Sequence, residues 1–479
     1  MLVKWNREEL KDKIYACWQG KNIGGTLGTP YEGKTEIQDI HGFASPKGEP
    51  LPNDDLDLQL VWLRAMQEIG PKALDANTLG WYWLRTIPPN WNEYGIGKSN
   101  LRMGILPPMC GEVKNAGWKT SNGAWIRSEV WACLAPGFPQ IAMTYGIMDA
   151  CIDHGISEGT ISEMFTATLE SAAFFCKDAR SAIEKALTFI PPVSRVSRLV
   201  RLVMEEYDKG TPWKKTREKV LEANDLGWFQ APANIAYTVI GLMYGEGDFK
   251  KSVYTAIDCG DDTDCTGATC GAVMGILGGT KAIPQDLAEY IGDRIVTVAM
   301  DRTFGRTPAT CKELTEQVID MMPDVLHAYG VTSEWTDGMT EIDLEAAEKV
   351  PGREPYTVAF LNRSPYSYDI SQNCLSAVVE YAAEPFIRPL AEAKVEVTFR
   401  NVDSDPHWES VEVVLPDGWT AVYPHNQYLE HRSAQTSVYS KWKMTVTAGE
   451  NVGPVNRGMI VVTSEHRPLP FVIPLVWLG

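Results

Sequence analysis

The hydrophobic pattern of this chain changes its period near residue 335, and that change limits the folds open to it. Before this point apolar residues recur every three or four positions, as Leu10, Ile14 and Cys17 do, which is the spacing of one helix face. Beyond it apolar and polar residues alternate, as in KVEVTF at residues 394–399, which is typical of strands with one buried face. Because strand-like runs are not interspersed among the helical ones, the pattern favours an all-α body over an alternating α/β layout.

An acidic stretch that ends in Pro351, Gly352 and Pro355 separates the two parts and has the composition of a linker. The 479 residues suffice for two or three domains. We therefore predict a multidomain chain, with an all-α domain, a linker and a β-sandwich. Their expected ranges are 1–335, 336–355 and 356–479.

Charge, hydropathy and cysteine usage indicate which partners and which cellular compartment are expected. The net charge of −18 argues against nucleic acid or an anionic membrane as the main partner. No apolar run approaches the roughly 18 residues of a membrane span, and the first twenty residues lack the apolar stretch of a secretory signal. The ten cysteines form no CxxC pair, which favours reduced thiols. We therefore expect a cytoplasmic protein.

A cluster of polar residues opens the apolar run PNDDLDLQLVWL, which has helical spacing. It comprises Asn53, Asp54, Asp55 and Asp57. One interpretation is helix capping, because a polar residue there satisfies free N–H groups and complements the helix dipole. Capping needs only one such residue, however, so a cation site is the second interpretation, with Asp57 as an ordinary first-turn carboxylate.

A second acidic cluster precedes a helix that is rich in small residues. It comprises Asp258, Asp261, Asp262 and Asp264. Gly271 and Gly275 in the helix itself would let another helix approach closely, which suits the centre of a bundle. If both acidic helix starts face one cleft, four carboxylates converge there and cannot all stay ionised without a cation. Oxygen ligands suit Mg²⁺ or Mn²⁺ rather than zinc.

Three stretches, in this order along the chain, resemble motifs of the ADP-ribosylglycohydrolase family. Glu32, at the end of GGTLGTPYE, matches the glutamate of the family's glycine-rich first turn. NDDL at residues 53–56 stands where the family has T-D-D-T. GDDTDC at residues 260–265 stands where it has G-G-D-T-D-T.

A fourth motif, SNGAWIR, matches N-G-A-x-M-R of the family. It provides the substrate-binding candidates Asn122, Gly123, Trp125 and Arg127, and His154 is the candidate for a histidine that follows in the family. Arg127 is equally well interpreted as a salt-bridge partner, and His154 as a buried structural histidine. The resemblance covers roughly residues 10–300 and leaves the C-terminal part outside.

The resemblance implies an all-α fold that binds two Mg²⁺ ions, or Mn²⁺ in their place, and cleaves an ADP-ribosyl group from a small molecule or a protein. Two divalent ions can hold a diol and polarise a water, while paired carboxyl groups assist glycosidic cleavage. The implied catalytic residues are Glu32 and Asp55. The implied metal ligands are Asn53, Asp54, Asp55, Asp262 and Asp264.

Two departures from the family pattern keep other functions open. Leu56 and Cys265 replace threonines, and a neutral thiol is a poor ligand for Mg²⁺. The loop around Trp91 and Tyr94 could stack on a sugar or a base. The alternatives are therefore a glycosidase acting on another furanosyl sugar or a nucleoside, and a non-catalytic binding protein.

Overall fold

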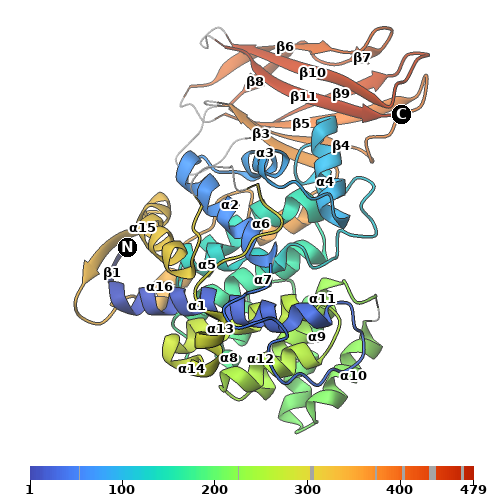
Figure 1. Cartoon of the computed structure of the whole chain (residues 1–479). Coiled ribbons are helices and arrows are strands. Elements are labelled where there is room, and N and C mark those ends of the chain that lie inside the picture. Colours follow the sequence, from blue (N-terminus) through green and yellow to red (C-terminus); the bar gives the residue numbers. More distant parts are fainter. Residues whose placement is uncertain are drawn as a thin grey trace.

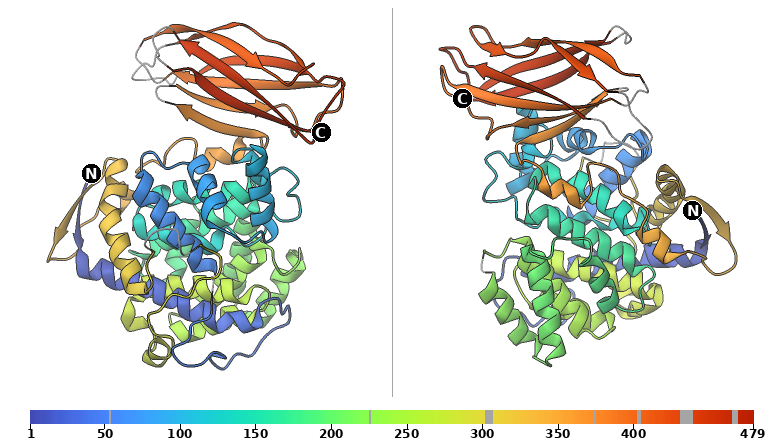
Figure 2. Two further views of the ribbon diagram at one scale, coloured as in Figure 1. Left: turned by 45° about the horizontal axis from the view of Figure 1, so that its top comes forward. Right: turned by 180° about the vertical axis from the view of Figure 1, so that it is seen from behind.

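The structure, a computed structural model, describes residues 1–52, 54–224, 226–301, 307–372, 375–401, 405–430, 439–464 and 469–479. A helical N-terminal domain is followed by a C-terminal region of antiparallel sheets, which lies at one end of the helical domain (Figure 1, Figure 2). The fold class predicted from the change of hydrophobic period is therefore confirmed.

Helices account for most of the N-terminal domain. They are α1 (Arg7–Gly28), α2 (Asp54–Ile69), α3 (Ala76–Thr86), α4 (Asn92–Met103), α5 (Glu129–Leu134), α6 (Pro139–His154), α7 (Glu158–Ala173), α8 (Ala179–Ala186), α9 (Arg195–Asp208), α10 (Trp213–Ala223), α11 (Ala231–Tyr244), α12 (Phe249–Asp258), α13 (Thr263–Gly278), α14 (Gln285–Ile291), α15 (Cys311–Ala328) and α16 (Leu344–Glu348).

Helices α1 and α13 pack along stripes of small residues, which places the end of α1 beside the start of α13. A Cβ on Gly20 or Gly24 would overlap the backbone of Gly271 or Gly267, respectively. A Cβ on Gly275 would likewise overlap the backbone of α1. The close helix approach predicted from Gly271 and Gly275 is confirmed, and it brings the loop after α1 next to the second acidic cluster.

The N-terminal domain also contains one pair of strands, which the sequence pattern did not reveal. Strand β1 (Leu2–Asn6) pairs in parallel with β2 (Thr332–Thr336). The segment interpreted as a linker packs on the same domain: the backbone N–H of Glu341 donates to the carbonyl of Lys4 at 2.8 Å, and Arg353 donates to carbonyls that follow α2. These hydrogen bonds hold residues 336–355 against the helices.

Two antiparallel sheets form the C-terminal region, in the orders β3-β4-β5-β9-β7 and β11-β10-β6-β8. In β5 and β9 the buried side chains alternate with more exposed ones, and the buried Val397 faces the buried Trp442 across the two strands. The strands are β3 (Ser367–Gln372), β4 (Leu375–Tyr381), β5 (Glu392–Asn401), β6 (His407–Val414), β7 (Thr420–Val422), β8 (Asn426–Leu429), β9 (Tyr439–Thr447), β10 (Val455–Ser464) and β11 (Phe471–Leu478).

The sheet region contacts the helical domain through α3, α4 and the loop that follows α4. Tyr368 of β3 forms a bridge with Pro108, and Asn77 of α3 donates to the carbonyl of Asp369 at 2.8 Å. Arg457 donates to the carbonyl of Met103, the last residue of α4, at 3.4 Å. No helix among the described residues has the length and apolar character that crossing a membrane requires.

Candidate active site

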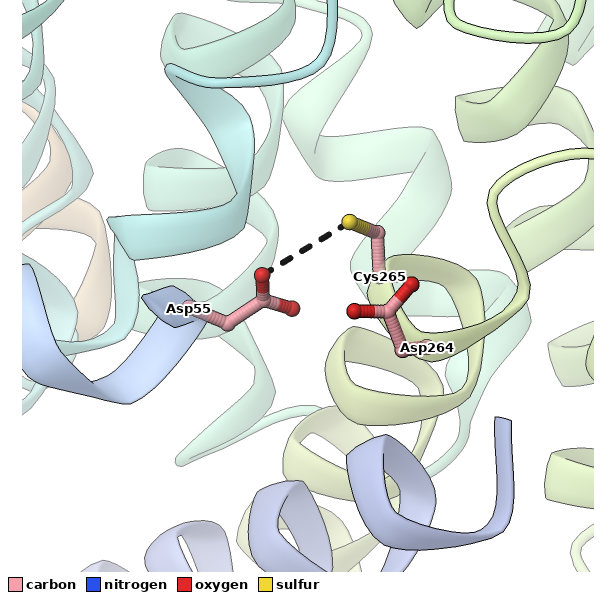
Figure 3. A group of neighbouring side chains, drawn as sticks. All are labelled: Asp55, Asp264 and Cys265. Carbon is pink, nitrogen blue, oxygen red and sulfur yellow. Dashed lines mark hydrogen bonds between the residues drawn. The ribbon is translucent and has the colours of Figure 1, made fainter. Parts of the chain in front are cut away.

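The two acidic clusters lie at the starts of α2 and α13, and these two helix ends meet. Asp54 and Asp55 are the first two residues of α2, and Asp264 lies in the first turn of α13. The thiol of Cys265 donates to Oδ1 of Asp55 over 3.6 Å, which links the two helix starts directly (Figure 3). The structure thus brings together residues that are more than two hundred positions apart in the sequence.

Glu32 is held near the second cluster by backbone pairing of the loop after α1. A short 3₁₀ turn (Thr29–Tyr31) precedes it. After Glu32, the N–H of Gly33 donates to the carbonyl of Asp261 at 2.9 Å. The N–H of Asp261 in turn donates to the carbonyl of Lys34 at 2.8 Å. These bonds fix an otherwise exposed Glu32 at the rim of the acidic cluster.

Two groups of side chains have ligand atoms close enough to hold a divalent cation: Asp55 with Asp264 and Cys265, and Glu32 with Asp262 and Asp264. Within each group these atoms lie within 4.8 Å of one another. Oδ1 of Asp264, which belongs to both groups, is buried and accepts no hydrogen bond from a described residue. The carboxylate oxygens fit a hard cation such as Mg²⁺. Asn53, a further predicted ligand, lies outside the described residues.

Burial and mutual repulsion raise the pKa values of the carboxyl groups in the two acidic clusters. Burial, followed by the charge of Asp264, raises the pKa of Asp54 to about 6. Burial raises the pKa of Asp55 and that of Asp262 well above their ordinary values. Desolvation of its carboxyl group, with the charges of Asp264 and Asp54, raises the pKa of Glu32 to about 7. A bound cation would offset each of these shifts, since it favours the ionised form.

The thiol of Cys265 acts as a hydrogen-bond donor in this cluster. Burial raises its pKa well above the ordinary value, and the charges of Asp262 and Asp264 add to that effect. A neutral thiol that donates to Asp55 is a poor ligand for Mg²⁺. The carboxylates therefore provide the ligand atoms that fit this metal, and Cys265 fixes the orientation of Asp55.

A cavity of about 340 Å³ opens next to these helix starts. Five carboxyl groups and no lysine or arginine are found among its described lining residues. The carboxyl groups belong to Glu32, Asp54, Glu93, Asp262 and Asp264. The aromatic side chains in the lining are those of Trp91, Tyr94, Trp228 and Phe229. A strongly acidic cavity with aromatic walls suits a sugar and a cation together.

Asn122 and Gly123, predicted to bind substrate, line this cavity. The side-chain amide of Asn122 donates to Oδ2 of Asp262 at 2.6 Å, and the indole N–H of Trp125 donates to the amide oxygen of Asn122 at 2.9 Å. Asn122 therefore orients an acidic residue of the cluster, and the fully buried Trp125 holds Asn122 from behind.

Arg127 and His154 are fully buried and do not line the cavity. Arg127 forms ion pairs with Asp149 at 3.0 Å and Asp153 at 2.9 Å, and its guanidinium also donates to the carbonyl of Gly123. His154 contacts Asp153 at 2.8 Å. These contacts match the structural alternatives considered for both residues: they support the cavity wall at Gly123 from within the protein.

Sequence reasoning missed Glu93, Trp228 and Phe229 as cavity residues. Glu93 lies between Trp91 and Tyr94, in the stretch expected to be a loop, which the structure instead shows to be the start of α4. An acidic residue next to these aromatic residues was the available signal. Trp228 and Phe229 precede α11 and offered no motif. Their position depends on a hydrogen bond that the backbone N–H of Ala231 donates to the carbonyl of Thr120.

Comparison with known proteins yields one family. A family model described as ADP-ribosylglycohydrolase matches residues 6–313. No curated protein matches the chain significantly. Among solved structures, a FixG-related protein from Vibrio parahaemolyticus is 8% identical over 22% of this chain and 98% of its own, with a TM-score of 0.19. The yeast GGA1 GAE domain is 16% identical over 24% of this chain and 97% of its own, with a TM-score of 0.17. Likenesses this weak bear on neither fold nor function.

Proposed function

The chain belongs to the ADP-ribosylglycohydrolase family, and from that premise we propose that its acidic cavity hydrolyses the glycosidic bond of an ADP-ribosyl or other ribofuranosyl group. Membership of the family supports hydrolysis of a glycosidic bond. The identity of the substrate goes beyond what the family match supports and is part of the proposal. The observation that carries it is the convergence of Asp54 and Asp55 with Asp262 and Asp264 beside one cavity.

Divalent cations form part of this proposal, with Mg²⁺ as the first choice and Mn²⁺ as the second. Asp54, Asp55, Asp262 and Asp264 would hold them. Asp55, Asp262 and Asp264 belong to the two clustered groups, and Asp54 lines the same cavity. Oδ1 of Asp264 is buried and accepts no hydrogen bond from the part of the chain that the structure describes. Such ions, when bound, would hold sugar hydroxyls and lower the pKa of a water molecule. Hydrogen bonds from Tyr94 to Asp54 and from Asn122 to Asp262 orient two of the four ligands, as outer partners of metal ligands commonly do.

Glu32 and Asp55 are the proposed catalytic carboxyl groups, and their surroundings suit different tasks. Glu32 lines the cavity at its rim, and desolvation, the largest cause of its raised pKa, favours its acceptance of a proton from water even when a cation pairs with Asp54 and Asp264. Asp55 is fully buried and receives the thiol of Cys265. Glu32 would take the proton from the attacking water. Asp55 would supply negative charge within the cluster once a bound cation offsets its raised pKa.

A second substrate class is favoured by the charge of the cavity. The pyrophosphate of ADP-ribose carries negative charge, and the described lining provides five carboxyl groups with no lysine or arginine to pair with it. A neutral furanosyl sugar or nucleoside avoids this repulsion, and the aromatic wall can stack on a sugar face or a base. A glycosidase for such a furanoside is therefore the alternative.

Two assays separate these substrates. Calorimetric titration with ADP-ribose in the presence of Mg²⁺ should show binding if the ADP-ribosyl proposal is right, and no heat at millimolar ligand would count against it. Hydrolysis of a panel of nitrophenyl furanosides and nucleosides tests the alternative. Absence of turnover with the furanosides and nucleosides and with an ADP-ribosylated compound would leave the non-catalytic binding protein as the surviving interpretation.

A further inference from the structure

Glu93 is a buried carboxyl group in the cavity wall that belongs to neither acidic cluster. It lies in the first turn of α4, is 2% exposed, and is among the residues that line the cavity. Its Oε2 accepts no hydrogen bond from a described residue. A buried polar atom without a partner is costly, so this oxygen is suited to a partner that the protein itself does not supply.

The neighbours of Glu93 connect it to both acidic clusters. Its carboxyl group lies against the backbone of Gly123, where any Cβ would overlap Oε1 of Glu93. Asn122, next to that glycine, donates to Asp262 at 2.6 Å. Tyr94, next to Glu93, donates through its hydroxyl to Asp54 at 3.2 Å. Glu93 therefore lines the same cavity as Asp54, Asp262 and Asp264.

The protonation of Glu93 is set by burial, by two groups on α6 and by Ser121. Burial raises the pKa of Glu93 to about 7, the charge of His154 lowers it, and that of Asp153 raises it. The Ser121 hydroxyl also lowers this pKa by hydrogen bonding. Asp153 itself forms an ion pair with Arg127. The raised pKa of Glu93 therefore favours the protonated form that the acid of a glycosidase needs.

We propose that Glu93 is the proton donor to the leaving group in the cleavage of the glycosidic bond. This inference rests on the proposed function and adds a catalytic residue to it. The bond between the anomeric carbon and the leaving oxygen breaks, its electron pair stays on that oxygen, and the oxygen takes the proton of Glu93. A water oxygen then bonds to the anomeric carbon and loses one proton to Glu32, which later releases it to solvent. The products are a free sugar and an alcohol, one water is consumed, and Glu93 regains a proton from solvent.

The test compares two substrates that share one sugar and differ in leaving group. Methyl ribofuranoside needs a proton on its leaving oxygen, whereas 4-nitrophenyl ribofuranoside releases a stable phenolate and needs it far less. In Glu93→Gln we expect kcat on the methyl glycoside to fall about 100-fold or more, and kcat on the nitrophenyl glycoside by less than about 10-fold. Equal losses on both substrates, or a rise of KM alone, would overturn the proposal and make Glu93 a residue that only binds the sugar.

A matched control is Glu170→Gln. Glu170 is equally buried, burial likewise raises its pKa well above the ordinary value, and it does not line the cavity. Its replacement should leave the ratio of the two rates unchanged. A changed ratio in this control would show that the effect of Glu93→Gln comes from loss of a buried carboxyl group in general, and would overturn the assignment.

The wild-type pH profile provides a second test that needs no folded variant. The rate on the methyl glycoside should decline as pH rises through the pKa of Glu93, while the rate on the nitrophenyl glycoside should decline less over the same range. Identical profiles for both substrates would contradict the inference. Failure of the wild-type protein on both glycosides and on an ADP-ribosylated compound would instead refute the proposed function, on which the inference depends, so the two failures are distinguishable.

Discussion

Gly24 of α1 and Gly267 of α13 touch so closely that a Cβ on Gly24 would overlap the carbonyl group of Gly267. Through this contact the backbone that presents Glu32 is held beside the backbone that presents Asp262 and Asp264. Neither glycine is in the cavity, yet their contact sets the distance between the two sides of the acidic cluster. The geometry of the site therefore depends on the packing of two helices.

Gly24→Ala should lower the free energy of unfolding by about 1–3 kcal/mol, the usual cost of overpacking. The reason is that the two backbones must move apart. Differential scanning calorimetry would measure the change in melting temperature. Gly117→Ala is the control, because a Cβ there meets no atom within 4 Å and should change stability by less than about 0.5 kcal/mol. Equal effects of both substitutions would contradict the packing argument.

Asp264→Ala should abolish stabilisation by Mg²⁺. Ligand at one hundred times its dissociation constant stabilises a folded protein by about 2.7 kcal/mol, which a melting curve with and without the metal detects. Asp57→Asn is the control on α2. Asp57 accepts the backbone N–H groups of Val298 and Ala299 at 2.5 and 2.6 Å, so its loss should lower the melting temperature but leave the shift caused by Mg²⁺ intact. A full shift in Asp264→Ala would refute the metal assignment.

Arg127→Met should cost about 3–5 kcal/mol of stability, since it leaves two buried carboxylates, those of Asp149 and Asp153, without their cation. Urea unfolding would measure the loss. Arg180→Ala removes an exposed arginine that also pairs with two carboxylates, Glu184 and Asp208, and should have only a small fraction of that effect, because solvent screens exposed pairs. Similar losses in both variants would argue against a structural role specific to Arg127.

Asp153 should stabilise the fold in a pH-dependent manner. Burial opposes its ionisation, but the charges of Arg127 and His154 outweigh burial and lower its pKa to about 2. A carboxyl group whose pKa is lower in the folded than in the unfolded state contributes stability that is fully present above about pH 4 and is lost as pH falls towards 2. The stability difference between the wild type and Asp153→Asn should therefore shrink from pH 5 to pH 2. A constant difference over this range would contradict the prediction.

The fold class and the two halves of the site could be predicted from the sequence because both leave local signals. A buried helix stripe and a buried strand face have different periods, so the change near residue 335 separated the helical domain from the sheets. Paired aspartates ahead of apolar helices, such as Asp54 with Asp55, pointed to a cation because capping alone needs fewer acids. The small residues of α13 indicated close packing for the same local reason.

The remaining features depend on contacts between distant parts of the chain. Arg127 belongs to a motif that suggested substrate contact, but Asp149 and Asp153 from α6 form ion pairs with its guanidinium inside the protein. Asp57 looked like a first-turn carboxylate, and it also binds a backbone segment about 240 positions away. Glu93 gains its importance from its place in the cavity lining and from its contact with Gly123, about 30 positions away. No local pattern encodes such partners.

The decisive measurement is hydrolysis by metal-stripped protein before and after addition of Mg²⁺, with an ADP-ribosylated compound and 4-nitrophenyl ribofuranoside as substrates. If the acidic clusters form one metal-dependent glycosidic site, turnover of at least one substrate should appear on addition of Mg²⁺ and should be absent in Asp264→Ala. Turnover that is the same without metal, or that survives in Asp264→Ala, would contradict the assignment of this cavity.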